Sequence, residues 1–579
     1  MRKFNRYKKN YELNFSLGLL QKLYLLGFII LIGVLFNYQI VKGNYYSKRA
    51  KNNYVRVIPL RSMRGTIFDR NNIALAYDKA VFNISVIPYQ IRNKKEELFN
   101  QLSEFLNYDL KLINKNYKKN TLSLFSPVNI IINIDKLSAL RLKERFKDII
   151  LITTQPQRYY PYPYQSAHIL GYVKEATSFY DKLKKYGYNP LERVGFFGVE
   201  QYYDAYLRGN DGGNLIEVDA KGRIVGFLGE RIPLKGKNVH LTIDNRIQQI
   251  AKDSMGDKKG AIIFMDSDSG ELLALFSYPS FDSNAFITGK NTGKFLTDKN
   301  CPLINRAIQS TYPIGSIFKP IISISALEEK KITSSTTFNC TGKLTLGSTK
   351  FGCWSVHHDE NLYEALAHSC NVYFYKVGLI LGQKTISKWS KKFKLDSLTG
   401  IDLPYEKKGL SPNANWKQKK LKKSWYTGDT VNLSIGQGYM LATPLEATVA
   451  INAIANNGYF VIPSILKGVE QVNSSLSSRT YSGISEKNIN IVKQGMRMTV
   501  STKTGTANML KPLNLNIAGK TGTAQTRGKS HGWFIGFFPY KEPKYTICVF
   551  LENGGSSHEA LNVVYNFLNS LKSQNLLEK

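Results

Sequence analysis

The longest uninterrupted apolar run lies near the N-terminus. From Leu23 to Val41 the chain reads LYLLGFIILIGVLFNYQIV, 19 residues without a charge, which is close to the length that crosses the hydrocarbon core of a bilayer. The next residues are KGNYYSKRAK, so no small-residue cleavage site follows. The pattern predicts an uncleaved single-pass anchor, with residues 1–22 as a short basic tail on the cytoplasmic side.

After the anchor, short apolar runs alternate with lysine-rich stretches that are compatible with helices. The runs YVRVIPLRSM, AVFNISVIP and NIIINI predict strands in a mixed α/β region over residues 43–240. A larger domain is predicted over 241–579. It opens with VHLTIDNRIQQIAKDS, a strand leading into an amphipathic helix. The following AIIFMDSDSGELLALFSYP predicts a β-hairpin, because turn residues separate two apolar runs.

The C-terminal part also combines apolar runs typical of strands with a segment of helical spacing. INIAGKTGTAQ and HGWFIGFFP, separated by TRGKS, predict two antiparallel strands, and KYTICVFLE predicts a third. The last segment, EALNVVYNFLNSLKS, has apolar residues at helical spacing. The pattern therefore predicts an α+β fold, in which an antiparallel sheet carries packed helices. With 579 residues, the chain is too long for one core.

The net charge is compatible with several classes of anionic partner and does not distinguish among them. The chain has a formal charge of +36 and a pI of about 9.7, which is compatible with an anionic polymer or an anionic membrane surface. The lysines are spread along the chain, as in a composition rich in Lys, Asn, Ile and Tyr. Their tightest cluster, WKQKKLKKSW at Trp416–Trp425, is interpreted as a solvated loop, and no nucleic-acid partner is expected.

The motif SIFK at Ser316–Lys319 is the first candidate for chemistry. Pro313 and Gly315 precede it, as at a helix start, which places Ser316 in the first turn near free backbone N–H groups. Ser316 and Lys319 are three residues apart and share a face. A serine hydroxyl needs a base to become a nucleophile, and a lysine of lowered pKa serves that role. Alone, the motif also fits a helix-capping serine beside an exposed lysine.

Two further motifs complete a site for acyl transfer. SCN contains Ser369 and Asn371, suited to proton relay and to holding a substrate carbonyl, although it also fits a capping turn. KTG begins at Lys520, on a strand whose edge could pair with an extended peptide. We expect Thr521, Gly522 and Thr523 to bind substrate, with the N–H groups of Ser316 and Thr523 as an oxyanion hole. These catalytic and substrate-binding candidates are Ser316, Lys319, Ser369, Asn371, Lys520, Thr521, Gly522 and Thr523.

KTGTA occurs twice in the chain. The copy at 503–507 is flanked by polar, loop-like residues, whereas an apolar strand leads into the copy at 520–524. We therefore assign the catalytic motif to the second copy. The order SIFK, SCN, KTG describes a serine enzyme that works through an ester intermediate.

These motifs resemble the penicillin-binding protein family of serine acyl-transferases. Segments of the first region resemble the non-catalytic pedestal of its class B members: RGTIFDRNNIALA at Arg64–Ala76, RYYPYPYQSAHILGYV at Arg158–Val173, GFFGVEQYYDAYLRGNDGG at Gly195–Gly213 and LTIDNRIQ at Leu241–Gln248. GDTVNLSIGQGY and the GTA of Gly505–Ala507 resemble the elongation-specific penicillin-binding protein 2 branch. One departure is Asn72, where the family usually has glycine in a turn.

The resemblance implies a peptidoglycan D,D-transpeptidase. The serine would attack the D-Ala-D-Ala bond of a stem peptide, an amine of a neighbouring stem would resolve the acyl-enzyme, and β-lactams would acylate Ser316. No cofactor is required for this chemistry. The resemblance further implies a bacterial inner-membrane protein with a periplasmic catalytic domain, and a multi-spanning glycosyltransferase of the elongation machinery as partner. The division-specific class B enzyme and a β-lactam-binding sensor remain alternatives.

Three of the five cysteines lie between the first two motifs or within the second. Some members of the penicillin-binding protein 2 branch carry a zinc ion there, and the resemblance places its ligands at Cys340, Cys353, His357 and Cys370. Three thiolates and one imidazole suit a closed, structural zinc site. His358 is an alternative to His357. A Cys340–Cys353 disulfide and three unrelated thiols are the other interpretations.

Overall fold

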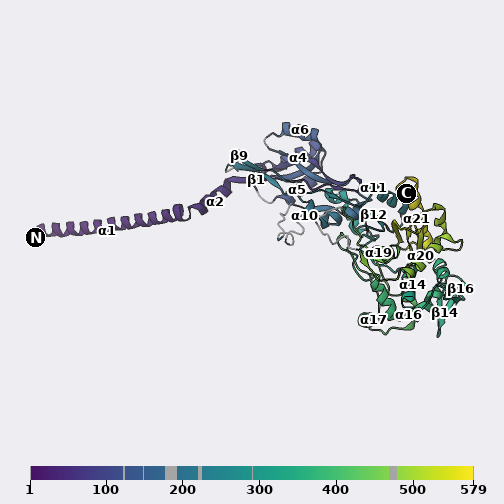
Figure 1. Cartoon of the computed structure of the whole chain (residues 1–579). Coiled ribbons are helices and arrows are strands. Elements are labelled where there is room, and N and C mark those ends of the chain that lie inside the picture. Colours follow the sequence, from purple (N-terminus) through teal and green to yellow (C-terminus); the bar gives the residue numbers. More distant parts are fainter. Residues whose placement is uncertain are drawn as a thin grey trace. The chain divides into compact units, whose positions relative to one another are not determined.

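The structure is a computed structural model of the chain (Figure 1). It describes residues 2–121, 124–147, 149–176, 181, 185, 192–219, 224–289, 291–467 and 479–577. By their internal contacts these residues form two compact units. The first contains Met1–Ser62, Ala80–Pro156 and Asn210–Leu234; the second contains Met63–Lys79, Gln157–Gly209 and Lys235–Lys579. The predicted region 43–240 is thus divided between both units, and its boundary at 240 stays a prediction.

A long N-terminal helix carries the apolar run. Helix α1 (Arg2–Phe36) continues through a π-helical turn, η1 (Asn37–Val41), and α2 (Gly43–Tyr54) follows. Within the described ranges, Leu17–Val41 is the one helical stretch long and apolar enough to cross a membrane, with a mean hydropathy of 2.2 and no residue buried. The predicted span from Leu23 lies inside it. The chain therefore has one candidate membrane anchor.

The first unit combines two small sheet regions with helices. Strands β1 (Val55–Leu60), β8 (Gly212–Val218) and β9 (Ile224–Arg231) form an antiparallel sheet in the order β1-β8-β9. The second half of β3 (Ala74–Val86) pairs with β4 (Val128–Ile134), and α4 (Lys95–Leu106) and α5 (Leu110–Asn120) cover this pair. Their shared core contains Ile84, Phe99, Leu102, Ile113 and Ile130.

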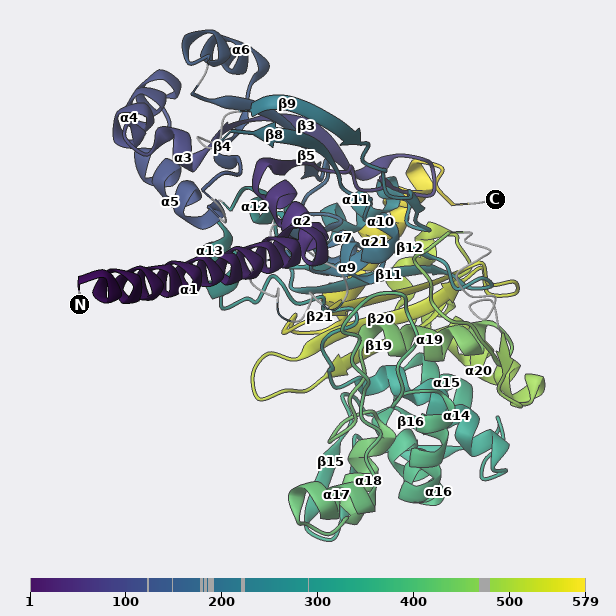
Figure 2. The same ribbon diagram turned by 90° about the vertical axis from the view of Figure 1, so that its left-hand side faces the viewer.

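The second unit is built on a five-stranded sheet in the order β12-β11-β21-β20-β19, with every pair antiparallel. The strands are β11 (Gly260–Asp266), β12 (Leu272–Tyr278), β19 (Ala518–Ala524), β20 (His531–Phe538) and β21 (Tyr545–Leu551). All are predicted by the apolar runs. Their residues are buried almost throughout, because helices pack on both faces (Figure 2).

Each face of this sheet has its own core. On one side, α11 (Asn245–Met255) and α21 (Ser557–Ser573) pack on alternate strand residues such as Ile262. On the other, α14 (Lys319–Glu328), α16 (Asn371–Lys392), α19 (Pro444–Ala455) and α20 (Glu486–Ser501) share a core with Ile263. The alternation follows from the two-residue period of a strand. β19 lies at the edge of the sheet, so its outer side is open to a ligand.

The remaining elements are shorter and connect these layers. They are α3 (Pro88–Ile91), α6 (Lys136–Arg145), β5 (Leu151–Tyr159), β2 (Ile67–Phe68), α7 (Ala167–Leu170), β6 (Val173–Glu175), β7 (Arg193–Gly195), α9 (Gly198–Tyr202), α10 (Asp204–Leu207), β10 (Val239–His240), α12 (Ser283–Thr288), α13 (Thr292–Thr297), η4 (Gly315–Phe318), β13 (Phe338–Cys340), β14 (Lys343–Leu346), β15 (Thr349–Gly352), β16 (His358–Glu360), α15 (Leu362–Ala367), α17 (Ala414–Leu421), α18 (Thr427–Ser434), β17 (Tyr459–Phe460), β18 (Thr480–Tyr481) and η5 (Asn508–Leu513).

Three of the pedestal-like motifs meet in one buried ion network. Glu200 accepts hydrogen bonds from Arg64 Nη2 at 2.9 Å and from Arg158 Nε at 2.5 Å, and all three side chains are nearly inaccessible to solvent. Asp78 and Asp204 pair with Arg158 and Arg64 in turn. These segments are far apart in the sequence, so the network ties them together inside the second unit.

Two local interpretations change in the structure. The lysine cluster at Trp416–Trp425 is not a solvated loop, because α17 spans most of it and Lys417 is buried. Asn72 has a φ of 65°, a left-handed conformation that asparagine tolerates better than most non-glycine residues. The turn that the family makes with glycine is thus retained here.

Candidate active site

Ser316 lies in the 3-10 turn η4, directly before α14, and Pro320 occupies the first turn of that helix. Proline fits there because the missing N–H has no helical partner in that position. Ser316 lines a cavity of about 1150 Å³, together with Ser369, Asn371, Thr521 and Thr523. The structure therefore brings residues of all three motifs to one cavity.

Close backbone contacts hold the serine turn in place. Gly315 has a φ of +56°, and a Cβ there would lie 2.9 Å from Thr523 O. Its N–H donates to Gly436 O at 2.9 Å, and a Cβ on Gly436 would lie 2.3 Å from Gly315 O. The turn is thus wedged between β19 and the Gly436–Gly438 turn, in a space that admits no side chain.

Lys319 is fully buried and its ammonium group has three oxygen partners. Nζ donates to Ser369 O at 2.8 Å, to Ser369 Oγ at 3.2 Å and to Asn371 Oδ1 at 2.7 Å. Burial lowers the pKa of Lys319 from 10.5 to about 8, because desolvation disfavours the charged form. A substantial fraction of the amine is therefore neutral near pH 8, as a general base requires.

The SCN turn owes its shape to the start of α16. Ser369 has a φ of +56°, and Cys370 is the N-cap of α16, with its sulfur accepting from Tyr373 N. The N–H of Asn371 donates to Cys353 Sγ at 3.2 Å. The turn thus directs Ser369 and Asn371 toward Lys319, while Cys370 joins the cysteine cluster.

The second KTG copy lies on β19 and the first does not lie on a strand. Lys520 is buried, and its Nζ donates to Thr521 O at 3.0 Å. Desolvation, reinforced by the positive charge of Lys319, lowers the pKa of Lys520. A Cβ on Gly522 would lie 2.9 Å from Ile317 Cγ2, so the close approach that this glycine allows is to the serine turn itself.

The first KTG copy supports the other motifs of the site through side-chain contacts. It forms a turn between α20 and η5, where Thr506 Oγ1 lies 2.7 Å from Thr521 Oγ1 and Thr506 N donates to Ala367 O. Thr504 Oγ1 lies 2.7 Å from His368 Nε2, and His368 Nδ1 lies 2.5 Å from Glu360 Oε1. The first KTG copy therefore contacts both β19 and the residues that directly precede the SCN motif.

Sequence reasoning missed several residues that line the cavity. Trp354 is 62% exposed, and its indole N–H donates to His368 O at 3.0 Å. Asn432, Gln437 and Thr506 also line the cavity. Trp354 lies in no motif that the sequence analysis identifies, whereas Asn432 and Gln437 lie in GDTVNLSIGQGY, which was identified only as a mark of the family branch. Thr506 belongs to the first KTG copy, which the sequence analysis does not assign to the catalytic site because no apolar strand leads into it.

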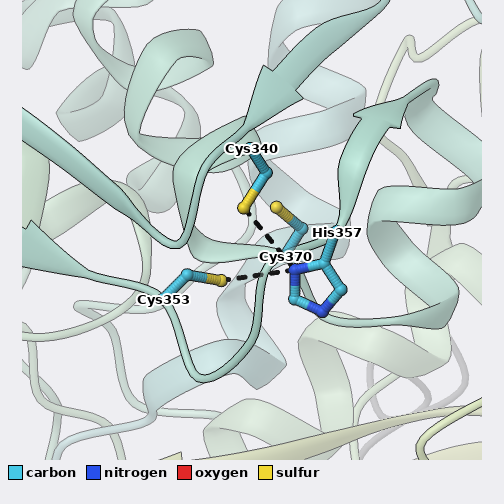
Figure 3. Close-up of side chains that lie close together, drawn as sticks. All are labelled: Cys340, Cys353, His357 and Cys370. Atoms are coloured by element: carbon cyan, nitrogen blue, oxygen red, sulfur yellow. Dashed lines mark hydrogen bonds between the residues drawn. The ribbon is translucent and has the colours of Figure 1, made fainter.

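The cysteine cluster forms a compact donor set next to the SCN turn, and one of its members, Cys353, also lines the cavity. Figure 3 shows the sulfur atoms of Cys340, Cys353 and Cys370 converging with the ring of His357, and the four candidate ligand atoms lie within 4.8 Å of one another. His357 Nδ1 is 3.6 Å from Cys340 Sγ and 3.5 Å from Cys353 Sγ.

The geometry distinguishes among the interpretations left by the sequence. His358 starts β16, is exposed and lies outside the cluster, so His357 is the histidine that faces the thiols. The five cysteines, all within the described ranges, are free, and no disulfide joins Cys340 to Cys353. Hydrogen bonding from the Cys370 thiol, with backbone N–H groups, lowers the pKa of Cys353. A thiolate of this kind favours a soft divalent cation.

Comparisons with known proteins agree with this arrangement. The family model of the penicillin-binding protein transpeptidase domain matches residues 260–570, and that of the penicillin-binding protein dimerisation domain matches residues 59–241. A relative named peptidoglycan D,D-transpeptidase MrdA, from Salmonella typhimurium, is 33% identical over 91% of each chain.

Two solved structures show the same fold. The complex of penicillin-binding protein PBP2 with MreC from Helicobacter pylori matches with a TM-score of 0.81 and 30% identity, over 90% of this chain and 99% of that chain. A peptidoglycan synthase complex, described as coordinating polymerisation and crosslinking, matches with a TM-score of 0.71 and 28% identity, over 96% and 98%.

Proposed function

This chain belongs to the penicillin-binding protein transpeptidase family, and from that premise we infer that it is a peptidoglycan D,D-transpeptidase. It cross-links stem peptides during lateral elongation of the cell wall, and β-lactams inhibit it by acylating the same serine. The observation that carries the proposal is the buried Lys319, held between Ser369 and Asn371 beside the cavity that Ser316 lines.

The proposed reaction has two halves. Ser316 Oγ attacks the carbonyl carbon of the penultimate D-Ala while neutral Lys319 takes the hydroxyl proton. The proton passes through Ser369 to the departing amine, and terminal D-Ala leaves. An amine of a second stem peptide then attacks the ester, its proton returns by the same groups, and Ser316 is regenerated.

The other site residues bind and orient the donor peptide. The open edge of β19 pairs with the extended peptide backbone, and Thr521 and Thr523 contact its terminal carboxylate. The N–H groups of Ser316 and Thr523 stabilise the oxyanion. Lys520 directly precedes Thr521 on the same strand, and its buried ammonium group donates to Thr521 O and so fixes the strand beside the cavity. Asn371 holds the amide next to the scissile bond.

Release of D-Ala tests this assignment directly. The full chain, incubated with a donor peptide that ends in D-Ala-D-Ala and an amine acceptor, should release D-Ala and form a longer peptide. Lys319→Met should slow the release by about 10²–10⁴-fold, the usual contribution of a general base. Release at the wild-type rate in this variant would remove Lys319 from the mechanism.

The structure supports a site for a structural zinc ion, which we propose for Cys340, Cys353, His357 and Cys370. The soft, thiolate-rich donor set fits this ion. A bound zinc ion would link the β13–β16 segment to the SCN turn and would take no part in the reaction. Metal analysis of the purified chain should give about one zinc per chain. Cys353→Ser should lower that content, whereas Cys301→Ser, an exposed cysteine outside the cluster, should not. Equal metal loss in both variants, or none in either, would contradict the site.

Localisation and partners follow from the family and the anchor. We propose a single-pass inner-membrane protein with residues 1–22 in the cytoplasm and residues 43–579 in the periplasm. The solved relatives in complex with MreC and in a peptidoglycan synthase complex support membership of the elongation machinery, with a multi-spanning glycosyltransferase as partner. A protease added outside spheroplasts should degrade the catalytic domain. Protection of that domain would reverse the orientation.

A further inference from the structure

A basic helix stands beside the candidate active site and takes no part in the chemistry above. Residues 407–428 contain seven lysines and no aspartate or glutamate. Helix α17 spans Ala414–Leu421 within this stretch and ends at Lys422, which has a left-handed φ of 55°. Like charges at neighbouring positions of a helix repel one another and destabilise it. Other contacts must therefore stabilise this helix.

One buried lysine fixes the helix. Lys417 Nζ forms an ion pair with Asp429 Oδ2 at 2.5 Å, and the Lys417 side chain is only 4% exposed. Three aromatic rings surround this ammonium group, those of Trp425, Tyr426 and Tyr439, at 6.0, 4.9 and 5.6 Å. Such contacts stabilise a cation that has lost part of its hydration.

The same contacts place α17 next to the cavity. The ring of Trp416 lies 5.2 Å from that of Tyr439, and Tyr439 follows Gly438, which lines the cavity. Asp429 belongs to α18, whose Asn432 also lines it. Gly428 lies against Phe351 of β15 in the cavity wall, and Figure 2 draws α17, α18 and β15 together.

The other lysines of this helix and its following turn have no acidic partner. Lys419, Lys420, Lys422 and Lys423 are exposed, and none forms a salt bridge with any residue that the structure describes. Apart from the Cys353 thiol, which belongs to the cysteine cluster, the charged side chains that line the cavity are Lys350 and Arg527, and no carboxylate is among its described lining residues. The adjoining helix adds further positive charge, whose attraction for an anion is only partly screened by salt.

We propose that Lys419, Lys420, Lys422 and Lys423 form a docking surface for the anionic peptidoglycan strand, beside the cavity whose lining includes Lys350 and Arg527. This inference rests on the proposed function, which supplies a polymer whose stem peptides bear carboxylates. The surface holds the strand by charge, while β19 and the cavity bind only the reacting end of one peptide. Its role is to bring the strand to the cavity and keep it there.

The test compares three variants of the full chain in detergent micelles. The first changes Lys419, Lys420, Lys422 and Lys423 to Gln. The second changes the same four to Arg, which keeps the charge. The third, a matched control, changes four helical lysines exposed on α5 to Gln: Lys111, Lys115, Lys118 and Lys119. Binding to purified, insoluble sacculi is measured by co-sedimentation as a function of salt.

The Gln variant of α17 should bind sacculi about tenfold more weakly, a modest contribution from each of four exposed ion pairs. This difference should shrink as salt is raised. The Arg variant and the α5 control should bind like the unchanged chain. Sacculus binding that is equal in the two Gln variants would overturn the proposal, because net charge alone would then account for binding. If the α17 Gln variant lost binding to phosphatidylglycerol vesicles while its binding to sacculi stayed unchanged, the proposal would also be overturned and the surface would be assigned to lipid.

Acylation by a fluorescent penicillin tests the proposed function independently of the docking surface. A fluorescent penicillin is small and occupies only the cavity, so its reaction with Ser316 reports the serine chemistry and not strand docking. Normal acylation with unchanged sacculus binding in the α17 Gln variant would refute the docking surface alone. Failure of the unchanged chain to react would refute the proposed function.

Discussion

At the scale of single residues, burial decides the chemistry of the site. The sequence marks Ser316 and Lys319 as neighbours on one face, but spacing does not reveal that Lys319 is inaccessible to solvent. The structure supplies this through α14, which lies beneath α16 and brings Nζ to Ser369 and Asn371. Asn371 and Ser369 were predicted as site residues from a three-residue motif, whereas Trp354 carries no such signal.

The pKa of Lys319 leads to a pH dependence for acylation. Burial lowers this pKa to about 8, and the neutral amine is the active form. The rate of acylation by a penicillin should therefore rise from about pH 6, reach half its maximum near pH 8 and level off above about pH 9. Stopped-flow fluorescence with a labelled penicillin measures it. A rate that keeps rising to about pH 10 would show that the pKa of Lys319 is not lowered.

Thr506 provides a second prediction at this scale. Its hydroxyl lies 2.7 Å from that of Thr521 on β19, so Thr506→Val leaves the Thr521 hydroxyl without this partner. We expect acylation to slow by about fivefold, because one hydrogen bond at a substrate-contacting group is worth about 1 kcal/mol. Thr502→Val is the matched control, since its hydroxyl only bonds back to Met498 O in the helix. Equal effects in the two variants would show that Thr506 acts through general stability.

At the scale of elements, apolar periodicity predicts the central sheet well. The runs at β11, β12, β20 and β21 each contribute residues to both cores, and the structure confirms these four strands and the edge strand β19. Prediction fails at α17, because five of its eight residues are polar or charged, and the buried ion pair Lys417–Asp429 that holds the helix in place cannot be read from the sequence pattern. It also misses the supporting role of the first KTG copy, which depends on contacts between residues distant in sequence.

The contact between η4 and β19 provides a prediction about elements. Gly315→Ala places a Cβ at 2.9 Å from Thr523 O in a backbone conformation that favours glycine. The strand must then move away from the serine turn, and we expect acylation to fall at least about tenfold. Gly528→Ala is the control, because no atom lies within 4 Å of its Cβ position. Unimpaired acylation in Gly315→Ala would mean that this close packing does not position the serine.

At the scale of the whole molecule, the pedestal-like motifs acquire a physical role. The resemblance of Arg64–Ala76, Arg158–Val173 and Gly195–Gly213 to class B members indicates the family but does not explain the residues. In the structure, Arg64, Arg158 and Glu200 form one buried network that joins these three segments. Such long-range convergence cannot be derived from periodicity, because charged residues at these positions are ordinarily solvent-exposed.

Removing the central charge of this network should destabilise the chain strongly. Glu200→Gln leaves two buried guanidinium groups without their shared carboxylate, and breaking a buried pair in this way typically costs about 3–5 kcal/mol. The melting temperature from thermal unfolding should fall by several degrees. Lys388→Gln, which breaks the exposed Lys388–Glu329 pair, should cost less than about 1 kcal/mol. Equal shifts for both variants would contradict the structural role of the network.

The central claim is that Ser316 forms a covalent acyl-enzyme in the cavity shared by the three motifs. Intact-mass spectrometry of the full chain after exposure to a fluorescent penicillin tests it most directly. The account predicts one stable adduct of the mass of the penicillin, which is absent in Ser316→Ala. An adduct that persists in Ser316→Ala, or none on the folded wild-type chain, would contradict the account.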